Sequence, residues 1–424
     1  MTTDNSGAEA PIAVIGAGIV GLATARAIQR TGRPVVVLDA GEPGRKTSFG
    51  NAGFIAIEHL MPLARPSVLK GVPRMLLDRN GPLTVHLPSL PWLLPWMARF
   101  ARAALSHTEV RKGIDCYAAM MSDANAAWRS EIQYSGLGEL FRTRGALYVY
   151  ETEAGFRAGS EQRDLQRGKG VAFEIVSGDR AREMAPGLAR HIVRGVHYTS
   201  GMHTIDPYRV VAVLAERFVA EGGRILRQGV TGFATSGDRP GRVTAVRTSG
   251  GDIAVSGTVI AAGRASGTLT SALGFKAPLV AERGYHVMVE PDNVRFDLPV
   301  SPAERGFFIT PMQEGLRLAG TVELGAPDQP ESWHRADILK RHLAEIFPGV
   351  GGAEKSRWMG ERPSLPDFRP AIGRAPHHTN VWCAYGHQHV GLTLATLTGR
   401  LIVQAMAGDP LPSAIDACDP GRFG

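Results

Sequence analysis

The sequence predicts an α/β protein in which a discontinuous domain with a mainly parallel sheet is joined to a second domain built on a mostly antiparallel sheet. Two observations lead to this fold class. Residues 11–40 read as strand, glycine-rich turn, helix and strand, the order of a parallel βαβ unit. Residues 140–151, 284–290 and 306–322 instead show the alternation and β-rich composition of antiparallel strands. A length of 424 residues allows two domains of this kind.

The amino-terminal unit has the features of a dinucleotide-binding motif. Three glycines follow its first strand at G-x-G-x-x-G spacing: Gly16, Gly18 and Gly21. The first permits a tight turn, the second lets the backbone approach a pyrophosphate, and the third lets the helix pack on the sheet. Unpaired amides at the start of that helix, at Ile19 and Val20, attract phosphate. Asp39 ends the second strand, where its carboxylate is suited to a ribose diol.

A small, polar, glycine-rich loop, KTSFGNAGFIA at residues 46–56, follows Asp39 and is able to wrap a second nucleotide half. GAGIVG, Asp39 and TSFGNAG together resemble the D-amino-acid oxidase superfamily of FAD-dependent oxidoreductases, most closely its bacterial D-amino-acid dehydrogenases. The resemblance implies a Rossmann-type FAD-binding domain. It assigns further cofactor contacts to Ala40, Thr47, Ser48, Asn51, Ala52 and Gly53.

Later segments return to the cofactor domain. Asp206 and Pro207 are expected to begin a helix as N-cap and first residue. GTVIAAG, residues 257–263, resembles a family strand whose end lies against the cofactor, which implies contacts from Ala262 and Gly263; an ordinary buried strand is the alternative. We expect the FAD-binding domain to comprise residues 1–85, 200–272 and 358–424, and the substrate domain residues 86–199 and 273–357.

The segment WMGERPSLPDFRPAIG, residues 358–373, resembles the family's G-x-R-P…PD…P-x-I-G element. The resemblance implies a cofactor contact for Gly360 and a substrate-carboxylate contact for Arg362, since a guanidinium grips a carboxylate through two charge-assisted bonds. An arginine that braces the preceding loop is the alternative. Tyr285 occupies a strand position that borders the substrate in related enzymes, so it either donates its hydroxyl to the carboxylate or packs in the sheet.

The segment YGHQHVGLT, residues 385–393, resembles the family's YGHG-x-x-GLT element beside the flavin. The resemblance implies cofactor contacts from Gly386, Gln388, His389, Val390, Gly391, Leu392 and Thr393, and His387 is a further catalytic candidate. Gln388 stands where the family usually has glycine, which predicts a narrower or more polar pocket mouth. We expect no metal, because the sequence has no H-E-x-x-H or Cys/His ligand spacing.

The resemblance implies FAD-dependent oxidation of a small, anionic amino acid, with the D configuration expected first. Hydride would pass from Cα to flavin N5, and electrons would go on to a quinone or another acceptor. An oxygen-using oxidase of glycine, sarcosine or a D-proline-type secondary amine is the alternative. The TSFGNAG loop disfavours an NAD-dependent dehydrogenase, and a non-catalytic dinucleotide sensor would not explain the Arg362 element.

The composition limits the classes of binding partner and the cellular compartment that we expect. The net charge is +7, but the arginines are scattered among acids, which argues against nucleic-acid binding. Three cysteines without a CxxC pair favour a reducing compartment, so we expect a cytoplasmic protein. Residues 82–106 contain Trp92 and Trp96 and have two interpretations. One is a helix that roofs the active site or fills core, interrupted by Pro88, Pro91 and Pro95, and the other is a segment that contacts the inner face of the cell membrane peripherally.

Overall fold

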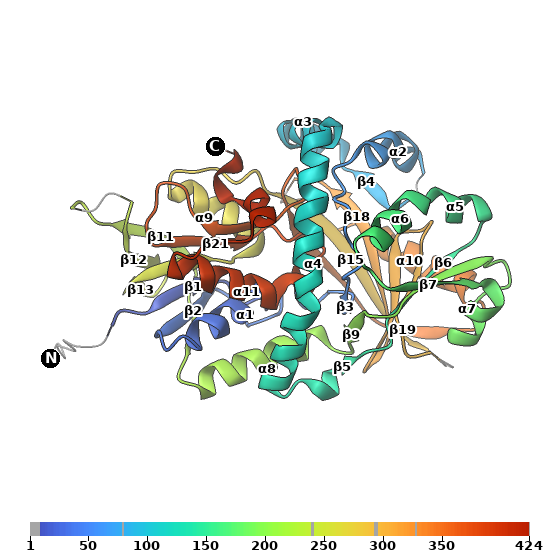
Figure 1. Cartoon of the computed structure of the whole chain (residues 1–424), viewed down its shortest axis with the longest axis horizontal. Coiled ribbons are helices and arrows are strands. Elements are labelled where there is room, and N and C mark those ends of the chain that lie inside the picture. Colours follow the sequence, from blue (N-terminus) through green and yellow to red (C-terminus); the bar gives the residue numbers. More distant parts are fainter. Residues whose placement is uncertain (1–8, 79, 239–240, 292–295, 327–328, 424) are drawn as a thin grey trace.

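Two large sheets organise the chain and lie on either side of helix α4 (His107–Ser135) in Figure 1. The structure, a computed structural model, describes residues 9–423 except residues 79, 239–240, 292–295 and 327–328. Among these residues one sheet has six strands, a second has nine, and two smaller sheets have three each. The predicted combination of a mainly parallel and a mostly antiparallel sheet is confirmed.

The six-stranded sheet is the predicted parallel sheet. Its strands, in spatial order, are β10 (Arg224–Arg227), β2 (Val35–Asp39), β1 (Ile12–Ile15), β14 (Gly257–Ile260), β21 (Val381–Tyr385) and β20 (Ala371–Arg374). All neighbours are parallel except β20, which runs antiparallel to β21. β1 and β14 are buried along their whole length, which explains the apolar character of both segments in the sequence.

Helices cover both faces of this sheet. α1 (Ile19–Gln29) and α11 (Gly391–Ala407) pack together on one face, with α8 (Pro207–Ala220) beside α1. α9 (Ser266–Ala272) and the small sheet β11 (Val230–Thr235), β12 (Val243–Thr248) and β13 (Gly251–Ala254) belong to the core on the other face. α8 begins as predicted, because Asp206 Oδ1 accepts a hydrogen bond from the Arg209 amide at 3.0 Å.

The nine-stranded sheet has the predicted antiparallel character. Its order is β19 (Gly352–Ser364), β15 (Val280–Pro291), β18 (Gly315–Leu324), β17 (Phe307–Met312), β16 (Val300–Pro302), β6 (Ala146–Tyr150), β8 (Arg194–Tyr198) and β7 (Phe173–Ser177), and β4 (Leu83–Val85) pairs with β18. The predicted hairpin joins β17 to β18, and Gly315 at its turn has a φ of +138°. α10 (His334–Ile346) and α7 (Gly178–Met184) pack on this sheet.

Helix α4 connects the two halves. Ser106 caps it by accepting a hydrogen bond from the Glu109 amide, and Gly136 ends it in the left-handed region. Its buried face, which includes Trp128, joins the core formed by α1 and α11. Residues 107–135 were expected in the substrate domain, whereas this helix packs on the helices of the six-stranded sheet.

Two predicted domain boundaries also disagree with the way the strands are divided between the two large sheets. β19 runs through residue 358 and belongs to the nine-stranded sheet over its whole length. β4 lies within residues 1–85, yet it pairs with β18. Local composition marks a strand, but the partner of that strand depends on residues far away in the chain. The remaining short elements are α5 (Glu153–Ala158), α6 (Ser160–Gly168) and the sheet β3 (Phe54–Ile55), β9 (Met202–Thr204) and β5 (Phe141–Arg142).

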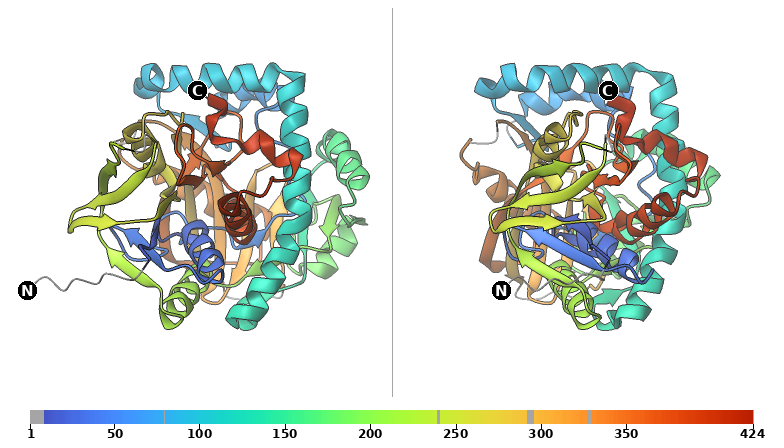
Figure 2. Two further views of the ribbon diagram at one scale, coloured as in Figure 1. Left: turned by 60° about the vertical axis from the view of Figure 1, so that its left-hand side comes forward. Right: turned by 90° about the vertical axis from the view of Figure 1, so that its left-hand side faces the viewer.

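Helices α2 (Pro66–Leu77) and α3 (Leu90–Leu105) form an outer layer, and α3 crosses the upper edge of the molecule in Figure 2. The predicted interruption of this segment by prolines is wrong for Pro91 and Pro95, which lie in the first turn and inside α3. An amide in the first turn has no intrahelical partner, so Pro91 costs no bond there. Trp96 is buried and Trp92 is exposed. Within the described ranges, we find no helix with the length and apolarity that a membrane crossing requires.

Candidate functional site

A cavity of about 740 Å³ opens at the carboxyl ends of β1 and β2 and extends past the ends of β14 and β21. This is the edge at which open parallel sheets bind ligands. The predicted residues that line it are Gly16, Gly18, Ile19, Val20, Asp39, Ala40, Thr47, Ser48, Asn51, Ala262, Gly263, Gly360, Gly386, His387, Gln388, Gly391 and Leu392. The predicted residues outside its lining are Gly21, Ala52, Gly53, Tyr285, Arg362, His389, Val390 and Thr393.

The turn between β1 and α1 requires glycine at its first and third glycine positions. Gly16 has a φ of +113°, and a Cβ there would lie 2.4 Å from the Ala261 carbonyl oxygen. A Cβ on Gly21 would lie 1.9 Å from the Gly16 carbonyl oxygen. Gly18 precedes α1 without a side-chain capping bond. The Ile19 amide, expected to be unpaired, is bonded to Ser48 Oγ, whereas the Val20 amide has no partner among the described residues and remains open to a pyrophosphate.

Asp39 is held at the cavity by two backbone amides. Its Oδ2 accepts from Ala17 and its Oδ1 accepts from Gly41, each at 2.9 Å. A carboxylate has about four acceptor positions, so both oxygens keep capacity for hydroxyl donors. The geometry fits the predicted ribose contact.

The loop after Asp39 is fastened on two sides. Ser48 Oγ accepts the Ile19 amide at 3.0 Å, and Thr47 Oγ1 donates to the Glu361 carbonyl at 2.7 Å. Asn51 Oδ1 accepts the Gly53 amide at 2.8 Å. Ala52 and Gly53 turn the chain into β3 instead of lining the cavity.

Arg317, which was not predicted as a site residue, supports the same loop from β18. Its Nη1 donates to the carbonyl oxygens of Phe49 at 3.0 Å and Asn51 at 2.8 Å. Burial lowers the pKa of Arg317 to about 10, so the side chain stays charged at neutral pH. Its signal in the sequence is a charged residue among the apolar positions of LRLAG.

The predicted cradle around residues 385–393 meets the cavity from its other end. Gly386 and Gln388 have φ values of +77° and +45°. His387 Nε2 lies 2.9 Å from Thr398 Oγ1, and burial lowers the pKa of His387 to about 3. The predicted catalytic role of His387 is therefore corrected: its neutral ring anchors the loop to α11. Thr393 Oγ1 accepts the Ala56 amide at 3.0 Å and holds β3 against this helix.

Residues from α4 hold the start of α11 and the loop before it. Trp128 Nε1 donates to the carbonyl oxygens of Leu392 at 2.9 Å and Thr393 at 3.1 Å. The Tyr117 hydroxyl bonds the Phe368 carbonyl oxygen and also contacts Gln388 Oε1 at 3.3 Å. Gln388 Nε2 is buried and has no hydrogen-bond partner in the described part of the chain. Trp128 and Tyr117 were not predicted, because the sequence of a helix does not indicate which distant residues its side chains contact.

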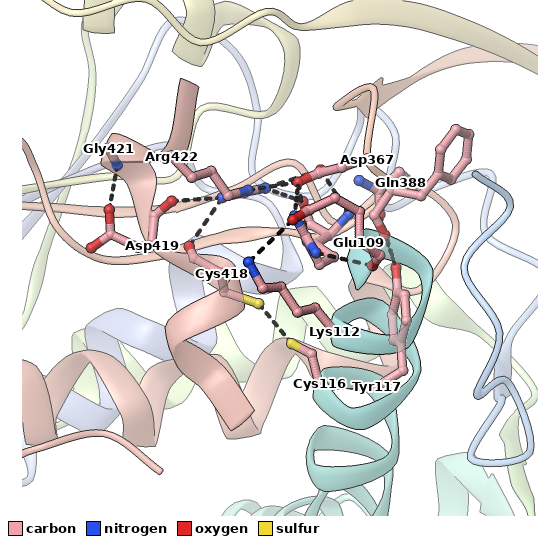
Figure 3. Close-up of polar contacts among 12 residues, drawn as sticks. Glu109, Lys112, Cys116, Tyr117, Asp367, Gln388, Cys418, Asp419, Gly421 and Arg422 are labelled. Carbon is pink, nitrogen blue, oxygen red and sulfur yellow. Dashed lines mark hydrogen bonds and ion pairs between the residues drawn. The ribbon is translucent and has the colours of Figure 1, made fainter. Parts of the chain in front are cut away.

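A cluster of buried charges fixes the turn between β19 and β20 (Figure 3). Asp367 accepts hydrogen bonds from Arg369 and Arg422, each at 2.7 Å. Arg369 also bonds Glu109 of α4 at 2.7 Å. Burial would raise the pKa of Asp367, but the two guanidiniums outweigh it and hold that pKa below its ordinary value. The segment that follows Arg362 is thus tied to α4 and to the carboxyl-terminal residues.

Arg362 lies at the end of β19 between Gly360 and Pro363, which both line the cavity. Its Nη1 donates to Glu282 Oε1 at 3.0 Å and to the Thr321 carbonyl at 3.1 Å. Glu282 Oε2 accepts from Ser364 Oγ at 3.0 Å. No partner of Arg362 Nε or Nη2 exists among the described residues, and the side chain is 21% exposed. The open edge of the guanidinium fits the predicted carboxylate contact, and Glu282 was not foreseen.

The predicted substrate contact of Tyr285 is wrong in this structure. Its hydroxyl donates to Glu323 Oε2 at 2.5 Å and accepts the Ser332 amide at 2.8 Å, and its ring contacts Trp333. Tyr285 therefore points to the α10 side of the sheet. The next residue, His286, stacks on Trp358 on the cavity side. Alternation along a strand predicts two faces without indicating which one meets the cofactor.

A pair of histidines lies beside this region. His389 Nε2 is 2.8 Å from His59 Nε2, and the two rings are nearly perpendicular at 82°. Burial and the charge of Arg362 lower the pKa of His389 to about 4. Burial, His389 and Arg65 lower the pKa of His59 well below its ordinary range. Both rings are therefore neutral at pH 7. Across the described residues, no three His, Cys, Asp or Glu side chains gather in a way that could hold a metal.

The arrangement fits a dinucleotide cofactor that carries a second ring system. One end of the cavity offers open helix amides and Asp39, and the other offers the Gly386–Leu392 cradle and the first turn of α11. The cradle contains His389, which contacts His59, and the segment of Arg362 lies against it at Pro363. An ADP half and a redox-active half would be held at opposite ends, with an anion site beside the latter.

Comparisons with known proteins agree with this geometry. The family model described as FAD dependent oxidoreductase (DAO) matches residues 11–405. A D-amino-acid oxidase of Bradyrhizobium diazoefficiens is 33% identical over 97% of this chain and 98% of its own. A D-amino acid dehydrogenase of Vibrio vulnificus is 30% identical over 93% and 95%. The crystal structure of glycine oxidase from Geobacillus kaustophilus has a TM-score of 0.76 at 18% identity, covering 98% of this chain and 99% of that one.

Proposed function

The chain belongs to the DAO family of FAD-dependent oxidoreductases and oxidises an amino acid with FAD as its cofactor, and we propose that the substrate is a small D-amino acid whose electrons pass to a quinone or another acceptor. The two similar relatives above carry D-amino-acid names, which supports this substrate class. Their similarity extends over nearly all of both chains.

The observation that carries the proposal is the open edge of Arg362 beside the cofactor cavity. Its Nε and Nη2 are free to grip a substrate carboxylate through charge-assisted bonds. Glu282 holds the other side of the guanidinium and fixes its orientation. Gly360 and Pro363 line the cofactor cavity, so a carboxylate on Arg362 keeps the substrate Cα close to the cofactor.

Bound FAD supplies the acceptor for the hydride that leaves Cα. The residues of this chain contribute orientation and electrostatics. Arg362 fixes the carboxylate and hence the face of Cα that is presented. The first turn of α11 directs its amides at the cradle, where a helix N-terminus stabilises negative charge.

Anaerobic reduction of the bound flavin tests the proposal. We expect a small D-amino acid, such as D-alanine or D-proline, to bleach the flavin absorbance within seconds. The L-enantiomer should bleach it at least tenfold more slowly. Equal bleaching by both enantiomers, or reduction by no amino acid in a broad panel, would contradict the proposed substrate class.

An oxygen-using oxidase of glycine, sarcosine or a D-proline-type secondary amine is the second candidate. It is supported by the D-amino-acid oxidase relative and by the fold shared with glycine oxidase. Peroxide formation measured against dye reduction separates the two functions. An oxidase produces one peroxide per substrate in air, whereas a dehydrogenase reduces a quinone analogue much faster than it consumes oxygen.

We also propose that the protein, expected in the cytoplasm, contacts a membrane surface peripherally through α2 and α3. Among the described residues, six of the ten exposed large hydrophobic side chains belong to α2, α3 or the short turn before α3: Leu76, Leu77, Leu87, Trp92, Leu94 and Leu105. Residues 60–105 contain six basic residues and one acidic residue, which favours anionic lipid. Sedimentation with anionic vesicles, but not with neutral ones, is the expected result. Loss of sedimentation in Trp92→Ser/Leu94→Ser would assign it to this surface.

A further inference from the structure

We propose that His389 and His59 form a proton relay of the substrate site, in which His389 takes the proton of the substrate's α-ammonium group and His59 passes it on. The inference rests on the proposed function and deepens it. An amino acid in neutral water carries an ammonium group, and only the free amine has the lone pair that assists loss of hydride from Cα. A group that accepts this proton is therefore needed in or near the site.

His389 lies in the loop that borders both the cofactor cavity and the segment of Arg362. His389 follows Gln388 directly, and Gln388 lines the cofactor cavity. The backbone amide of Gln388 donates a hydrogen bond to the Pro363 carbonyl oxygen at 3.4 Å, so this loop lies against the residue after Arg362. Arg362 is also close enough for its positive charge to lower the pKa of His389. A substrate held by its carboxylate on Arg362 thus presents its ammonium group within a few ångströms of these residues, because the two groups share one carbon.

The rings of His389 and His59 are in direct contact. Two neutral imidazoles joined through Nε2 at 2.8 Å have one N–H donor and one acceptor in the bond. Neither Nδ1 has a hydrogen-bond partner among the residues that the structure describes, and both rings keep part of their surface accessible. One Nδ1 is thus free to receive a proton, and the other is free to release one.

The charged and titratable groups around the pair favour transfer over storage of the proton. Arg362 of β19 and Arg65 before α2 both oppose a positive charge on the rings. The Tyr117 ring of α4 meets His59 edge-on. Glu282 of β15 is engaged with Arg362 and Ser364, and Glu58 bonds Tyr148. No carboxylate in the described ranges bonds either ring, so an imidazolium would not be held.

The step balances without any redox change. The ammonium N–H bond breaks and an N–H bond forms at His389 Nδ1. The proton on His389 Nε2 passes to His59 Nε2, and the proton on His59 Nδ1 leaves to water. His389 would be a catalytic residue, and His59 a positioning and relay residue that acts through it.

Proton release by the wild-type holoenzyme is the first test. The probes are 2-aminoisobutyrate, which has no Cα hydrogen and stays unoxidised, and isobutyrate, which has no amine. We expect binding of 2-aminoisobutyrate at pH 7 to release about one proton per site into a weakly buffered indicator solution. Isobutyrate should release none. Binding of 2-aminoisobutyrate without proton release would overturn the relay.

Two variants test the residues. The rate constant of anaerobic flavin reduction should fall about 100-fold at pH 7 in His389→Gln and at least tenfold in His59→Gln, the range of general-base effects. Both should approach wild type above pH 10, where the substrate amine is already free. His197→Gln, which removes a histidine bonded to the Arg144 carbonyl, is the matched control and should behave as wild type.

The outcomes separate the relay from the proposed function. Slowing by the same factor at every pH would make the histidines structural, and an unchanged rate would exclude them; either result overturns the relay alone. A wild-type flavin that no amino acid reduces, and no spectral response to 2-aminoisobutyrate, would overturn the proposed function and the relay with it.

Discussion

The two ends of the ligand site are built in different ways. The end of the cofactor cavity at the start of α1 is formed by backbone from a short stretch of chain, and Gly16, Gly18 and Gly21 shape it within six residues. The substrate end is formed by side chains that meet across the fold. Arg362 and Glu282 are 80 residues apart, and His59 and His389 are 330 apart. A local motif therefore specifies the first, whereas tertiary structure specifies the second.

Gly16→Ala should disrupt the backbone-built end of the cavity more strongly than any other substitution considered below. A Cβ at Gly16 would lie 2.4 Å from a backbone carbonyl and would require a left-handed alanine. We expect the purified variant to lose nearly all of its FAD, measured as the flavin-to-protein absorbance ratio, and to unfold at a lower temperature.

Gly32→Ala is the matched control for Gly16→Ala. Gly32 also has a positive φ, +82°, but a Cβ there would have no atom within 4 Å. This variant should lose about 1 kcal/mol of stability and keep its flavin. Full flavin content in Gly16→Ala would contradict the view that backbone geometry makes the cofactor end.

Arg362→Ala should have the next largest effect, and it acts on the other end. Arg362→Lys keeps the charge but loses the planar fork. Losing one charge-assisted bond costs about 1.5 to 3 kcal/mol, or roughly ten- to hundredfold in kcat/KM. Arg362→Ala should lose more, with FAD content near wild type in both variants.

Arg357→Ala, on the same strand, controls for removal of an arginine from β19. Arg357 pairs with Glu354 at the surface, so this variant should keep kcat/KM within about twofold. Loss of flavin instead of turnover in Arg362→Ala would show that this arginine braces the cofactor loop.

The difference between the two ends explains what the sequence could and could not predict. The strand, turn and helix of residues 12–29 and the lining glycines follow from spacing alone. Tyr285 was assigned to the wrong face because the register between β15 and β19 is decided by residues 352–364, far along the chain. His387 was assigned to catalysis because the bond to Thr398 is invisible until α11 has formed. Arg317 and Glu282 belong to no recognised sequence motif, so the sequence did not indicate their roles.

Glu58 lies where the two halves of the molecule meet, and it should make the free energy of unfolding depend on pH. Its carboxyl follows β3 and accepts a hydrogen bond from the Tyr148 hydroxyl of β6 at 2.7 Å, and its other oxygen has no partner within the described part of the chain. Burial raises the pKa of Glu58 from 4.5 to about 7, although the Tyr148 bond opposes the shift. Between these values the folded protein binds more protons than the unfolded chain. This group therefore lowers stability as pH rises from about 4.5 to 7, by about 3 kcal/mol in total.

Glu58→Gln should remove that slope, because a neutral amide does not titrate and still accepts the Tyr148 bond. The free energy of unfolding, measured with denaturant at saturating FAD, should exceed that of wild type above pH 7 and approach it near pH 4.5. Glu174→Gln, at an exposed position on β7, should follow the wild-type profile. Parallel profiles for Glu58→Gln and wild type would place the pH dependence elsewhere.

Gln388→Gly has the smallest expected effect and acts where the two ends meet. The substitution relieves a positive φ of +45° and removes a buried amide nitrogen without a partner among the described residues. It also loses the hydrogen bond from Tyr117 and leaves a void. These terms are each on the order of 1 kcal/mol and oppose one another, so stability should change by less than about 1 kcal/mol.

Gln388 lines the cofactor cavity and its side chain contacts Tyr117, so the void left by Gln388→Gly should widen this part of the cavity for a substrate side chain. We expect the ratio of kcat/KM for D-phenylalanine to that for D-alanine to rise about three- to tenfold. A change of this size corresponds to room in the pocket for one or two additional methylene groups. Tyr117→Phe keeps the volume of Gln388 and removes the hydroxyl that contacts Gln388 and the Phe368 carbonyl, so its ratio should stay near wild type. An unchanged ratio in Gln388→Gly would mean that this residue borders the cofactor alone, and the boundary between the two ends would then fall between Gln388 and His389.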